Sequence, residues 1–418
     1  MKKILAFLLA AVMVFSLAAC GNTPDDNSTP ANNDAAETMK VGFIFLHDEN
    51  STYDKNFIDA AKEACANMGV EMVQKTQIPE SNACYDAAVE LIDVEGCDII
   101  FADSFGHESF LMKAAAEYPD VEFCHATGTQ AHTSDLDNFH NAFAHIYEGR
   151  YLAGVVAGLK LKAMMQADST IVPKMGYVGA FTFAEVMSGY TSFYLGAKSI
   201  VPEVTMDVKF TGSWYDETKE KQAAQALIDG GCVLISQHAD SMGAPTACEA
   251  AGVPNVSYNG STEAACPNTW LISSRINWVP YFEYMITQVK NGEAIDTDWA
   301  GTLENGAVAI TDLGAAVADG TAEYLADVKA KLINKEINVF DTANFTLKVD
   351  AEAGLNAKAT VDENGKLIGY MADVDTDEAY AGDTEVVKDG VFEESEHRSG
   401  PYFDIEIDGI NLLDRAYG

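Results

Sequence analysis

Residues 98–125 read DIIFADSFGHESFLMKAAAEYPDVEFCH, and this stretch contains one strand–helix–strand unit. Residues 98–102 and 121–125 are short apolar runs typical of buried strands. Residues 107–118 between them have the pattern of a helix that ends before Pro119. Two strands joined by a helical crossover lie parallel in one sheet. The stretch therefore predicts an α/β fold with a parallel sheet and helices on its faces.

The same alternation extends in both directions along the chain. Before it, we predict strands at 41–46 and 70–73 and helices at 55–68 and 83–94. A second block begins with a helix at 147–165 and ends with a helix at 278–289. Its predicted strands lie at 175–178, 205–210, 233–236 and 255–258, and its other helices at 185–199, 217–228 and 241–251. Two such blocks predict two doubly wound lobes with a ligand cleft between them.

The C-terminal part of the chain has a different texture. Residues 346–418 are rich in Asp and Glu, and we expect an acidic extension of β-rich character. Alternating runs at 345–349, 366–371 and 403–407 predict its strands. The extension either completes the second lobe or adds a small β-rich unit to it.

The charge of the chain excludes some functions. Its 418 residues include 26 Lys and Arg against 64 Asp and Glu, a net charge of −38. Such a surface repels phosphate backbones and anionic membranes, so we expect no nucleic-acid partner. Attachment to a membrane then requires a covalent anchor or a partner.

The N-terminus predicts export. Lys2 and Lys3 precede an apolar run at 4–19, which is too short to span a bilayer and is typical of a signal peptide over 1–19. The sequence Leu-Ala-Ala-Cys-Gly that follows resembles the bacterial lipobox, which makes Cys20 a lipidation site. Residues 20–39 are then a disordered tether, and the protein is anchored at the extracytoplasmic face of the cell membrane.

Seven further cysteines follow Cys20, and no two of them form a CxxC pair. An odd number outside the cytosol leaves at least one unpaired within the chain, and we interpret those in apolar stretches as buried small hydrophobes. The seven are Cys65, Cys84, Cys97, Cys124, Cys232, Cys248 and Cys266.

The residues just past the predicted strands form the candidate binding site, because ligands of such sheets bind beyond the carboxyl ends of the strands. They are aromatic, hydroxylic and amide-rich, with little charge. Aromatic faces from two lobes can enclose a flat heterocycle, while hydroxyl, amide and carboxyl groups bind its edge. The selected residues are Tyr53, Asp103, Ser104, Phe105, Phe181, Glu185, Trp214, His238, Asp240 and Asn259.

Other chemistries find less support. The sequence lacks GxGxxG after a strand, GxxxxGK[ST] and GxSxG, and it shows no nucleophile with a nearby base, so we expect neither an enzyme nor a cofactor. A metal site would need His238 and Asp240 to meet His47 and His125, and we expect none. We interpret four histidines as polar surface groups: His125, His132, His140 and His145.

Several of these stretches together resemble the basic membrane protein (BMP) family of lipoproteins, the PnrA-like substrate-binding proteins of ABC transporters. The matching stretches, which lie within residues 40–310, are FADSFG, PDVEFCHATG, IYEGRYLAGVVAG, GYVGAFTFAEV, GSWYDETKEKQAA, SQHADS, SYN and RINWVPYF. The resemblance implies a type I periplasmic-binding fold that serves a membrane permease, and we expect a monomer. It implies one lobe at 40–141 plus 278–313 and a second at 142–277 plus 314–345.

The resemblance also bears on the ligand. The family's nucleoside-binding members usually carry an acidic residue for ribose where this chain has Asn259, so the chain is more similar to the purine-base branch. The stacking aromatic of the first lobe is Tyr53 or Phe57, and we prefer Tyr53 because Phe57 suits a core position. Phe181 and Trp214 are implied as the opposing aromatics.

Four functions remain as hypotheses. The first is a receptor for a purine base or nucleoside. The second is a receptor for another solute, such as a sugar, an amino acid or a signal molecule. The third is a surface adhesin or sensor partner that uses the acidic extension. The fourth, a hydrolase, has only scattered His and carboxylate residues in its favour.

Overall fold

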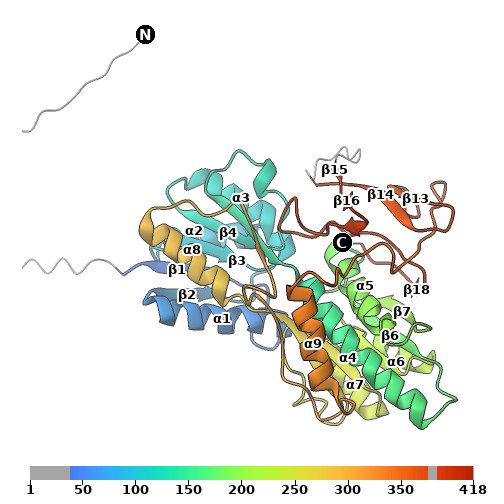
Figure 1. Cartoon of the computed structure of the whole chain (residues 1–418). Helices are drawn as coiled ribbons and strands as arrows, with labels where there is room; N and C mark the ends of the chain where they lie inside the picture. The colour runs from blue at the N-terminus through green and yellow to red at the C-terminus, as the bar shows by residue number, and fades with distance from the viewer. Residues whose placement is uncertain (1–37, 375–383, 418) are drawn as a thin grey trace, which may run out of the picture. The chain divides into compact units, whose positions relative to one another are not determined.

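The computed structural model describes residues 38–374 and 384–417. The predicted signal peptide and Cys20 lie outside these residues. Within them, the first block folds into a six-stranded parallel sheet with the order β11-β5-β4-β3-β1-β2 (Figure 1). Its strands are β1 (Lys40–Ile44), β2 (Glu71–Lys75), β3 (Ile99–Ala102), β4 (Glu122–Ala126), β5 (Phe139–Ala144) and β11 (Asp298–Gly301).

Local sequence signals fix the helices of this first lobe. In α1 (Thr52–Met68), the Ser51 side chain accepts a hydrogen bond from the Asp54 amide at the start, and Gly69 ends the helix at a positive φ of 63°. Phe57 and Ala61 of α1 face the core. The other helices are α2 (Asn82–Asp93), α3 (Glu108–Glu117), α8 (Val279–Asn291) and two short 3-10 turns, η1 (Phe105–His107) and η2 (Ala131–Thr133).

The second block forms a seven-stranded sheet with the order β12-β10-β9-β8-β6-β7-β18. Only the β10–β12 pair is antiparallel among its described strands. The strands are β6 (Lys174–Gly179), β7 (Thr205–Phe210), β8 (Leu234–Gln237), β9 (Asn255–Tyr258), β10 (Trp270–Ile276), β12 (Val308–Ile310) and β18 (Ile410–Leu412). The two parallel-sheet lobes confirm the predicted fold class.

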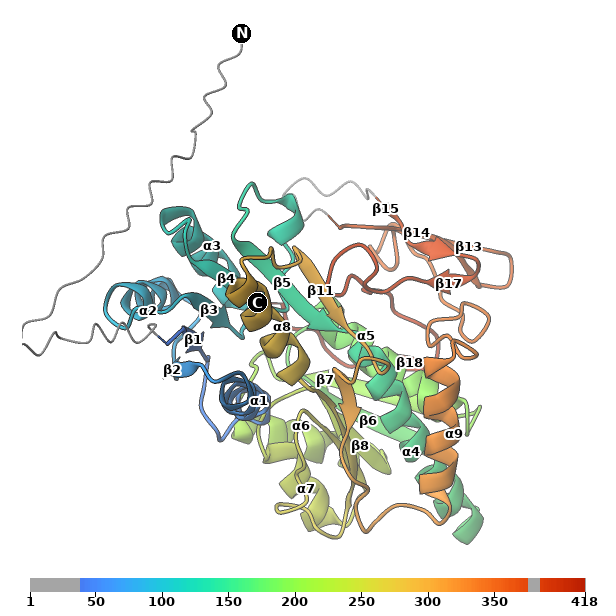
Figure 2. The same cartoon turned by 60° about the vertical axis from the view of Figure 1, so that its left-hand side comes forward.

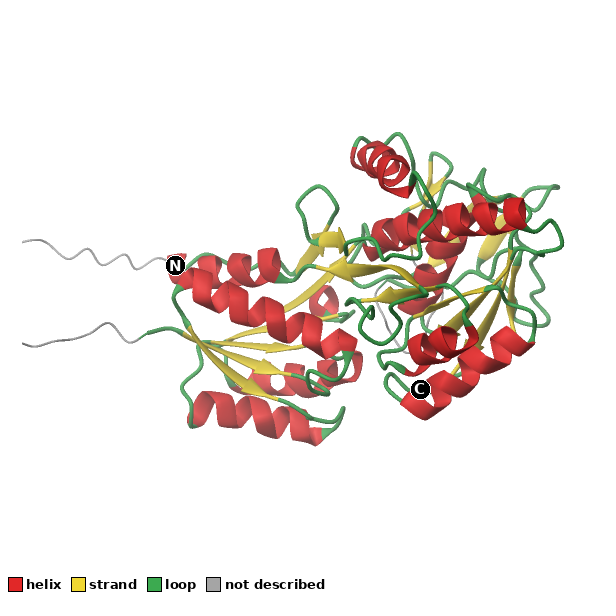
Figure 3. Cartoon of the chain, turned by 90° about the horizontal axis from the view of Figure 1, so that it is seen from below, coloured by secondary structure: helices red, strands yellow, loops and turns green. Residues whose placement is uncertain are grey.

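The helices of the second lobe cover both faces of its sheet. Figure 2 shows α6 and α7 on one side and α4 with α9 on the other. Figure 3 shows the strands of each lobe lying between helices. The helices are α4 (Ile146–Ala167), α5 (Ala184–Lys198), α6 (Glu217–Asp229), α7 (Gly243–Ala251) and α9 (Thr321–Ile333).

The chain passes between the two sheets three times. The connections join β5 to α4, β10 to α8, and β11 to β12. The expected third boundary, at 313–314, puts β12 in the first lobe, whereas β12 pairs with β10 in the second sheet. The crossing thus falls earlier, at residues 302–307.

Helices α4 and α5 pack closely because glycines lie at their interface. A Cβ added at Gly154 would overlap the carbonyl oxygen of Phe193, and one added at Gly196 would overlap that of Tyr151. The two backbones therefore approach more closely than any larger residue allows. This helix pair contributes much of the main hydrophobic core.

The C-terminal extension joins the second lobe and also forms small sheets of its own. The predicted strand at 366–371 is confirmed as β14 (Leu367–Ala372). The strands predicted at 345–349 and 403–407 are wrong, because the Asn356 side chain donates to the carbonyl groups of Lys348 and Glu406 where a strand ladder would lie. The other short strands are β13 (Ala359–Val361), β15 (Thr384–Glu385), β16 (Val387–Lys388) and β17 (Val391–Phe392).

Cysteine and histidine burial can be compared with expectation. All seven cysteines after Cys20 are buried and unpaired in the described residues, which confirms the interpretation of Cys65, Cys84, Cys97 and Cys124 as buried small hydrophobes. His125 and His140 are buried in β4 and β5, so their interpretation as surface groups was wrong: both strands lie inside the sheet.

No helix among the described residues is long and apolar enough to cross a membrane.

Candidate functional site

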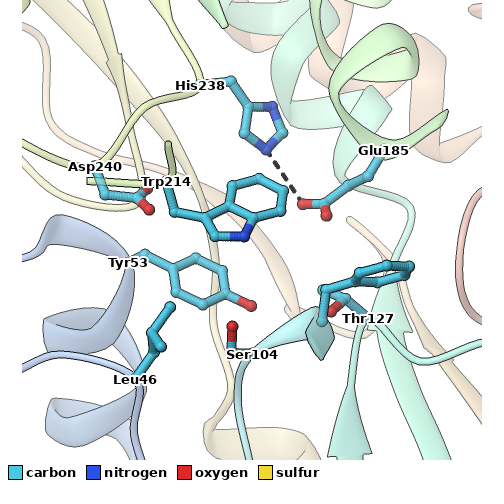
Figure 4. Close-up of a pocket in the computed structure, with 9 residues that line it drawn as sticks. Leu46, Tyr53, Ser104, Thr127, Glu185, Trp214, His238 and Asp240 are labelled. Atoms are coloured by element: carbon cyan, nitrogen blue, oxygen red, sulfur yellow. Dashed lines mark hydrogen bonds and ion pairs between the residues drawn. The ribbon is translucent and has the colours of Figure 1, made fainter. Parts of the chain in front are cut away.

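A pocket lies where the carboxyl ends of strands from both sheets face each other. Its empty volume is about 330 Å³. Figure 4 shows the side chains that line it, with the rings of Trp214 and Tyr53 at the centre. The first lobe provides Leu46, Tyr53, Ser104, Phe105 and Thr127, and the second provides Glu185, Trp214, His238 and Asp240.

Tyr53 is held in place by the first turn of α1. Its hydroxyl group donates to the carbonyl oxygen of Asp103 at 2.6 Å, and its ring centre lies 4.8 Å from that of Phe57. Burial, with the charges of Glu185 and Asp103, raises the pKa of the Tyr53 hydroxyl well above its usual value. The phenol therefore stays neutral and presents a fixed ring to the pocket.

Trp214 lies in the loop after β7 and is supported from behind by two phenylalanines. The Phe181 ring meets it edge-on with 5.0 Å between ring centres, and the Phe183 ring lies 6.0 Å away. The Trp214 carbonyl oxygen also accepts from the Asp240 amide at 3.1 Å. Both the ring and the backbone of Trp214 are thus fixed before any ligand arrives.

A buried Arg150–His238–Glu185 chain of hydrogen bonds reaches the pocket from α4. Arg150 Nη2 donates to His238 Nδ1 at 3.0 Å, while His238 Nε2 lies 3.2 Å from Glu185 Oε1. Because Nδ1 accepts, Nε2 carries the proton and donates to the carboxylate. Burial and the Arg150 charge lower the pKa of His238, so the ring is neutral. The chain orients Glu185 toward the pocket.

Arg150 is almost completely buried, with 1% of its surface exposed. Its guanidinium lies 3.4 Å above the centre of the Tyr258 ring and also donates to the Gln237 carbonyl oxygen at 3.0 Å. A cation over an aromatic face is attracted by the ring quadrupole. Arg150 thereby places a buried positive charge beside His238, which contacts Glu185 of the pocket.

Asp240 is the second carboxyl group of the pocket, and its surroundings favour the protonated form. Burial raises its pKa well above the usual value, and the charges of Glu220, Asp54 and Glu185 add to the effect. A buried carboxyl group that keeps its proton can donate as well as accept a hydrogen bond. Together, Glu185 and Asp240 give the pocket both a hydrogen-bond acceptor and a hydrogen-bond donor.

Seven of the ten predicted ligand-binding residues line the pocket. They are Tyr53, Ser104, Phe105, Glu185, Trp214, His238 and Asp240. Phe181 lies behind Trp214, and Asp103 lies beneath Leu46, whose amide donates to Asp103 Oδ1 at 3.1 Å. Asn259 is buried with a positive φ of 64° and is not among the lining residues.

The ten selected residues leave out three contributors to the site. Leu46 ends the first predicted strand and was assigned to it. Arg150 lies inside a helix, away from every strand end, and the only signal was a lone Arg in an apolar segment. Thr127 follows the fourth strand, but nothing in the sequence distinguished it from its neighbours.

The two lobes touch each other around the pocket. The Thr52 amide donates to the Asp240 carbonyl oxygen at 3.0 Å, and Asn56 Nδ2 donates to the Ile276 carbonyl oxygen at 2.6 Å. Phe105 meets Phe183 across the gap with 5.5 Å between ring centres. These contacts hold the lobes closed, as in a binding protein that encloses its ligand.

The histidines considered as metal ligands do not form a metal centre in the part of the chain that the structure describes. Among residues 38–374 and 384–417, no three His, Cys, Asp or Glu side chains are placed to hold a metal ion. His47 contacts Asp54, His125 contacts the Ser104 carbonyl oxygen, and His238 contacts Arg150 and Glu185. The geometry is that of a closed binding pocket with aromatic walls and polar edges.

Glu220, which accepts from the Ser241 amide next to Asp240, gives a test of the buried charge. Burial raises the pKa of Glu220 to about 7 from 4.5, so the stability that its proton provides is lost as the pH rises through this range. Replacing Glu220 with glutamine should therefore favour the variant over the wild type by about 2 kcal/mol on going from about pH 5 to about pH 8.

The measurement is urea unfolding of both proteins at several pH values. Buried histidines such as His238, whose pKa is lowered, change wild-type stability in the opposite sense, so only the difference between variant and wild type is informative. Glu217→Gln, on the exposed side of the same helix, is the matched control. A difference for Glu220→Gln that stays constant with pH would contradict the prediction.

The sequence of this chain is similar to those of known proteins. Residues 44–343 match a family model described as ABC transporter substrate-binding protein, PnrA-like (Bmp). A purine-binding protein of Brucella abortus is 31% identical over 350 residues, which cover 82% of this chain and 94% of the relative. A putative ABC transporter glucose-binding protein of Haloferax volcanii is 32% identical over 249 residues, 59% of this chain and 60% of that relative.

Solved structures share the fold at lower identity. A solute-binding protein of Aeropyrum pernix superposes with a TM-score of 0.61 at 18% identity, over 75% of this chain and 95% of its own. One from Conexibacter woesei gives 0.59 at 20% identity, over 72% of this chain and 98% of its own. Both are ABC transporter solute-binding proteins by description, and at this identity they bear on the fold alone.

Proposed function

Because the chain belongs to the PnrA-like family of ABC transporter substrate-binding proteins, we propose that it captures a purine base between its two lobes. Membership of the family makes it an extracytoplasmic protein that binds a small solute for an ABC transporter, and not an enzyme. The purine-binding relative from Brucella abortus supports the choice of ligand, because the similarity covers 94% of that relative. In this proposal the closed form delivers the base to a membrane permease.

The observation that carries the proposal is the pairing of aromatic rings with carboxyl groups in one small pocket. Tyr53 comes from the first lobe and Trp214 from the second, so a flat ring bound between the lobes meets both. Glu185 and Asp240 lie at its edge, where a purine carries ring nitrogens and N–H groups. The pocket is small: the space of about 330 Å³ between its side chains includes space open to solvent, which favours a base over the larger nucleoside.

The hydrogen-bonding roles follow from the surroundings of each carboxyl group. One oxygen of Glu185 accepts a hydrogen bond from His238 Nε2, which leaves the other oxygen to accept a hydrogen bond from a ligand N–H group. Asp240, whose pKa is raised by burial, keeps its proton and donates a hydrogen bond to an unprotonated ring nitrogen. The Ser104 and Thr127 hydroxyl groups can do either and complete the edge.

We further propose that a lipid on Cys20 holds the protein at the membrane, with the segment up to residue 39 as a tether. The support is the signal-like N-terminus and the lipobox resemblance. This anchor would keep the binding lobes beside the permease, since a diffusing protein would be diluted.

Direct identification of the ligand tests the proposal. We expect unfolding of the purified protein to release a purine base, detected by mass spectrometry. Ligand-free protein, titrated by calorimetry, should bind adenine or hypoxanthine at least about tenfold more tightly than adenosine or glucose, a difference of about 1.4 kcal/mol.

Other results have distinct meanings. Tighter binding of adenosine would move the assignment to a nucleoside, and tighter binding of glucose would align this chain with the Haloferax volcanii relative. Absence of binding to every purine, by a protein that still melts cooperatively, would overturn the proposed ligand class.

A further inference from the structure

A second cavity lies beside two of the connections between the lobes, which we call the hinge, and away from the pocket between the lobes. The space between its walls is about 1,190 Å³, a figure that includes space open to solvent. Three parts of the chain line it: the connections at 145–148 and 302–304, the end of α9 with the loop to Phe340, and residues 388–396 of the C-terminal extension. The family match ends at residue 343, so the extension contributes a wall outside the matched region.

The lining of the hinge cavity is strongly acidic. Only two lysines, Lys335 and Lys388, face six carboxylates, and Lys388 already pairs with Glu393 at 2.6 Å. The six carboxylates are Glu148, Glu304, Asp389, Glu393, Glu394 and Glu396. A concave surface of one sign concentrates ions of the other sign. The cavity therefore attracts cations and repels anions.

Glu394 adds an unpaired buried oxygen to this surface. Its residue is 2% exposed, its Oε1 accepts from the Ser188 hydroxyl group, and its Oε2 lacks a well-formed hydrogen bond among the described residues. Burial raises the pKa of Glu394 to about 7, although the Ser188 hydroxyl group and the nearby Ser395 hydroxyl group, which also lacks a well-formed hydrogen bond among these residues, favour the charged form. A buried acceptor without a partner is costly, so a donor in the cavity would stabilise it.

Aromatic rings form the apolar wall of the same cavity. The Tyr147 ring lies 5.2 Å from that of Phe340, and Phe340 lies 6.5 Å from Phe392, measured between ring centres. The charges of Glu394, Glu148 and Glu396 all act on Tyr147, so rings and carboxylates are close together. Aromatic faces beside carboxylates bind ammonium groups through cation–π attraction and hydrogen bonds.

We propose that the hinge cavity is a second ligand site, which binds a small aliphatic amine. A divalent metal ion is less suitable, because the described residues offer no group of three side chains placed as metal ligands. An amine instead places N–H donors on the Glu394 oxygen and its carbon chain against Tyr147 and Phe340. This site is independent of the proposed purine pocket, whose lining residues it does not share.

Calorimetry with spermidine and with putrescine, in 150 mM salt and on the purified protein, tests the proposal. We expect binding at one site per chain, weakened at least tenfold in Glu394→Gln. Glu63→Gln, on the exposed face of α1, removes the same charge elsewhere and should bind as the wild type does. At this salt concentration, exposed charges farther from the bound amine than about 8 Å are largely screened, which separates a built site from the general attraction of an acidic protein.

Glu304→Gln keeps the test valid if Glu394→Gln fails to fold. Glu304 is exposed at the rim of the cavity, so its replacement leaves the core intact and should still weaken spermidine binding several-fold. Equal binding by the wild type, Glu304→Gln and Glu63→Gln would overturn the proposal. So would the absence of saturable binding of either amine.

Discussion

Replacing Trp214 with alanine should abolish most of the purine affinity, with an increase in Kd of about 30- to 1,000-fold. The indole lies at the centre of the pocket, and truncating a central aromatic contact typically costs about 2–4 kcal/mol. Phe181 and Phe183 pack behind the indole, so we expect neither ring to move into its place and restore the lost contact with the ligand. Calorimetric titration with the base found in the protein measures the effect.

Tyr215→Ala is the matched control for Trp214→Ala. Tyr215 is the next residue in the same loop, but its ring lies against His47, 5.4 Å between centres, and does not line the pocket. Its removal should change Kd by less than about threefold. Trp214→Phe, which keeps an aromatic face, should fall between the two. Unchanged affinity in a folded Trp214→Ala protein would remove Trp214 from the proposed site.

Valine at Gly154 should be the most destabilising single change in the helical core. The added Cβ would overlap the Phe193 carbonyl oxygen, which is backbone and cannot rotate away. Separation of α4 from α5 would then disturb the main core, at a cost of about 3 kcal/mol or more. For a protein of this size, such a loss lowers Tm by about 4 °C or more, measurable by calorimetry.

Gly149→Ala on the same helix provides the control for this effect. A Cβ there meets only side chains, with Val308 Cγ1 the nearest at 3.1 Å. Alanine also has a higher helix propensity than glycine, by about 1 kcal/mol, so this variant should be neutral or slightly more stable. If Gly149→Ala and Gly154→Val melted alike, close helix approach would not be what Gly154 provides.

The sequence could predict the first lobe well because its strands are continuous apolar runs. The runs VGFIFL and DIIFA form β1 and β3, which lie inside the six-stranded sheet. A strand buried on both faces is apolar at every position, so the sequence pattern and the burial agree. The strands β5, β10 and β11 were not predicted. Their sequences FHNAFA, WLISSRI and DWAG mix polar and small residues, so pairing with neighbouring strands, and no continuous apolar pattern, makes them strands.

The candidate site was predictable to the extent that it follows strand ends. Residues such as Ser104 and His238 come directly after buried strands and do line the pocket. Arg150 could not be found in this way, because its guanidinium reaches the site from inside α4 and not from a residue directly after a predicted strand. Phe181 looks like its neighbours in sequence, and only the packing shows that it supports Trp214 from behind.

The strand β18 has a consequence for how the protein is made. It pairs with β7 in parallel, Ile410 beside Met206, so residues about 200 positions apart share one edge of the second sheet. Until residues 410–412 dock, the N–H and C=O groups along the outer edge of β7 are open to pairing with another chain. Such a long-range closure is slow to form. The interval before β18 docks is therefore when this edge is most exposed to aggregation, and a chaperone that covers β7 would help folding most during that interval.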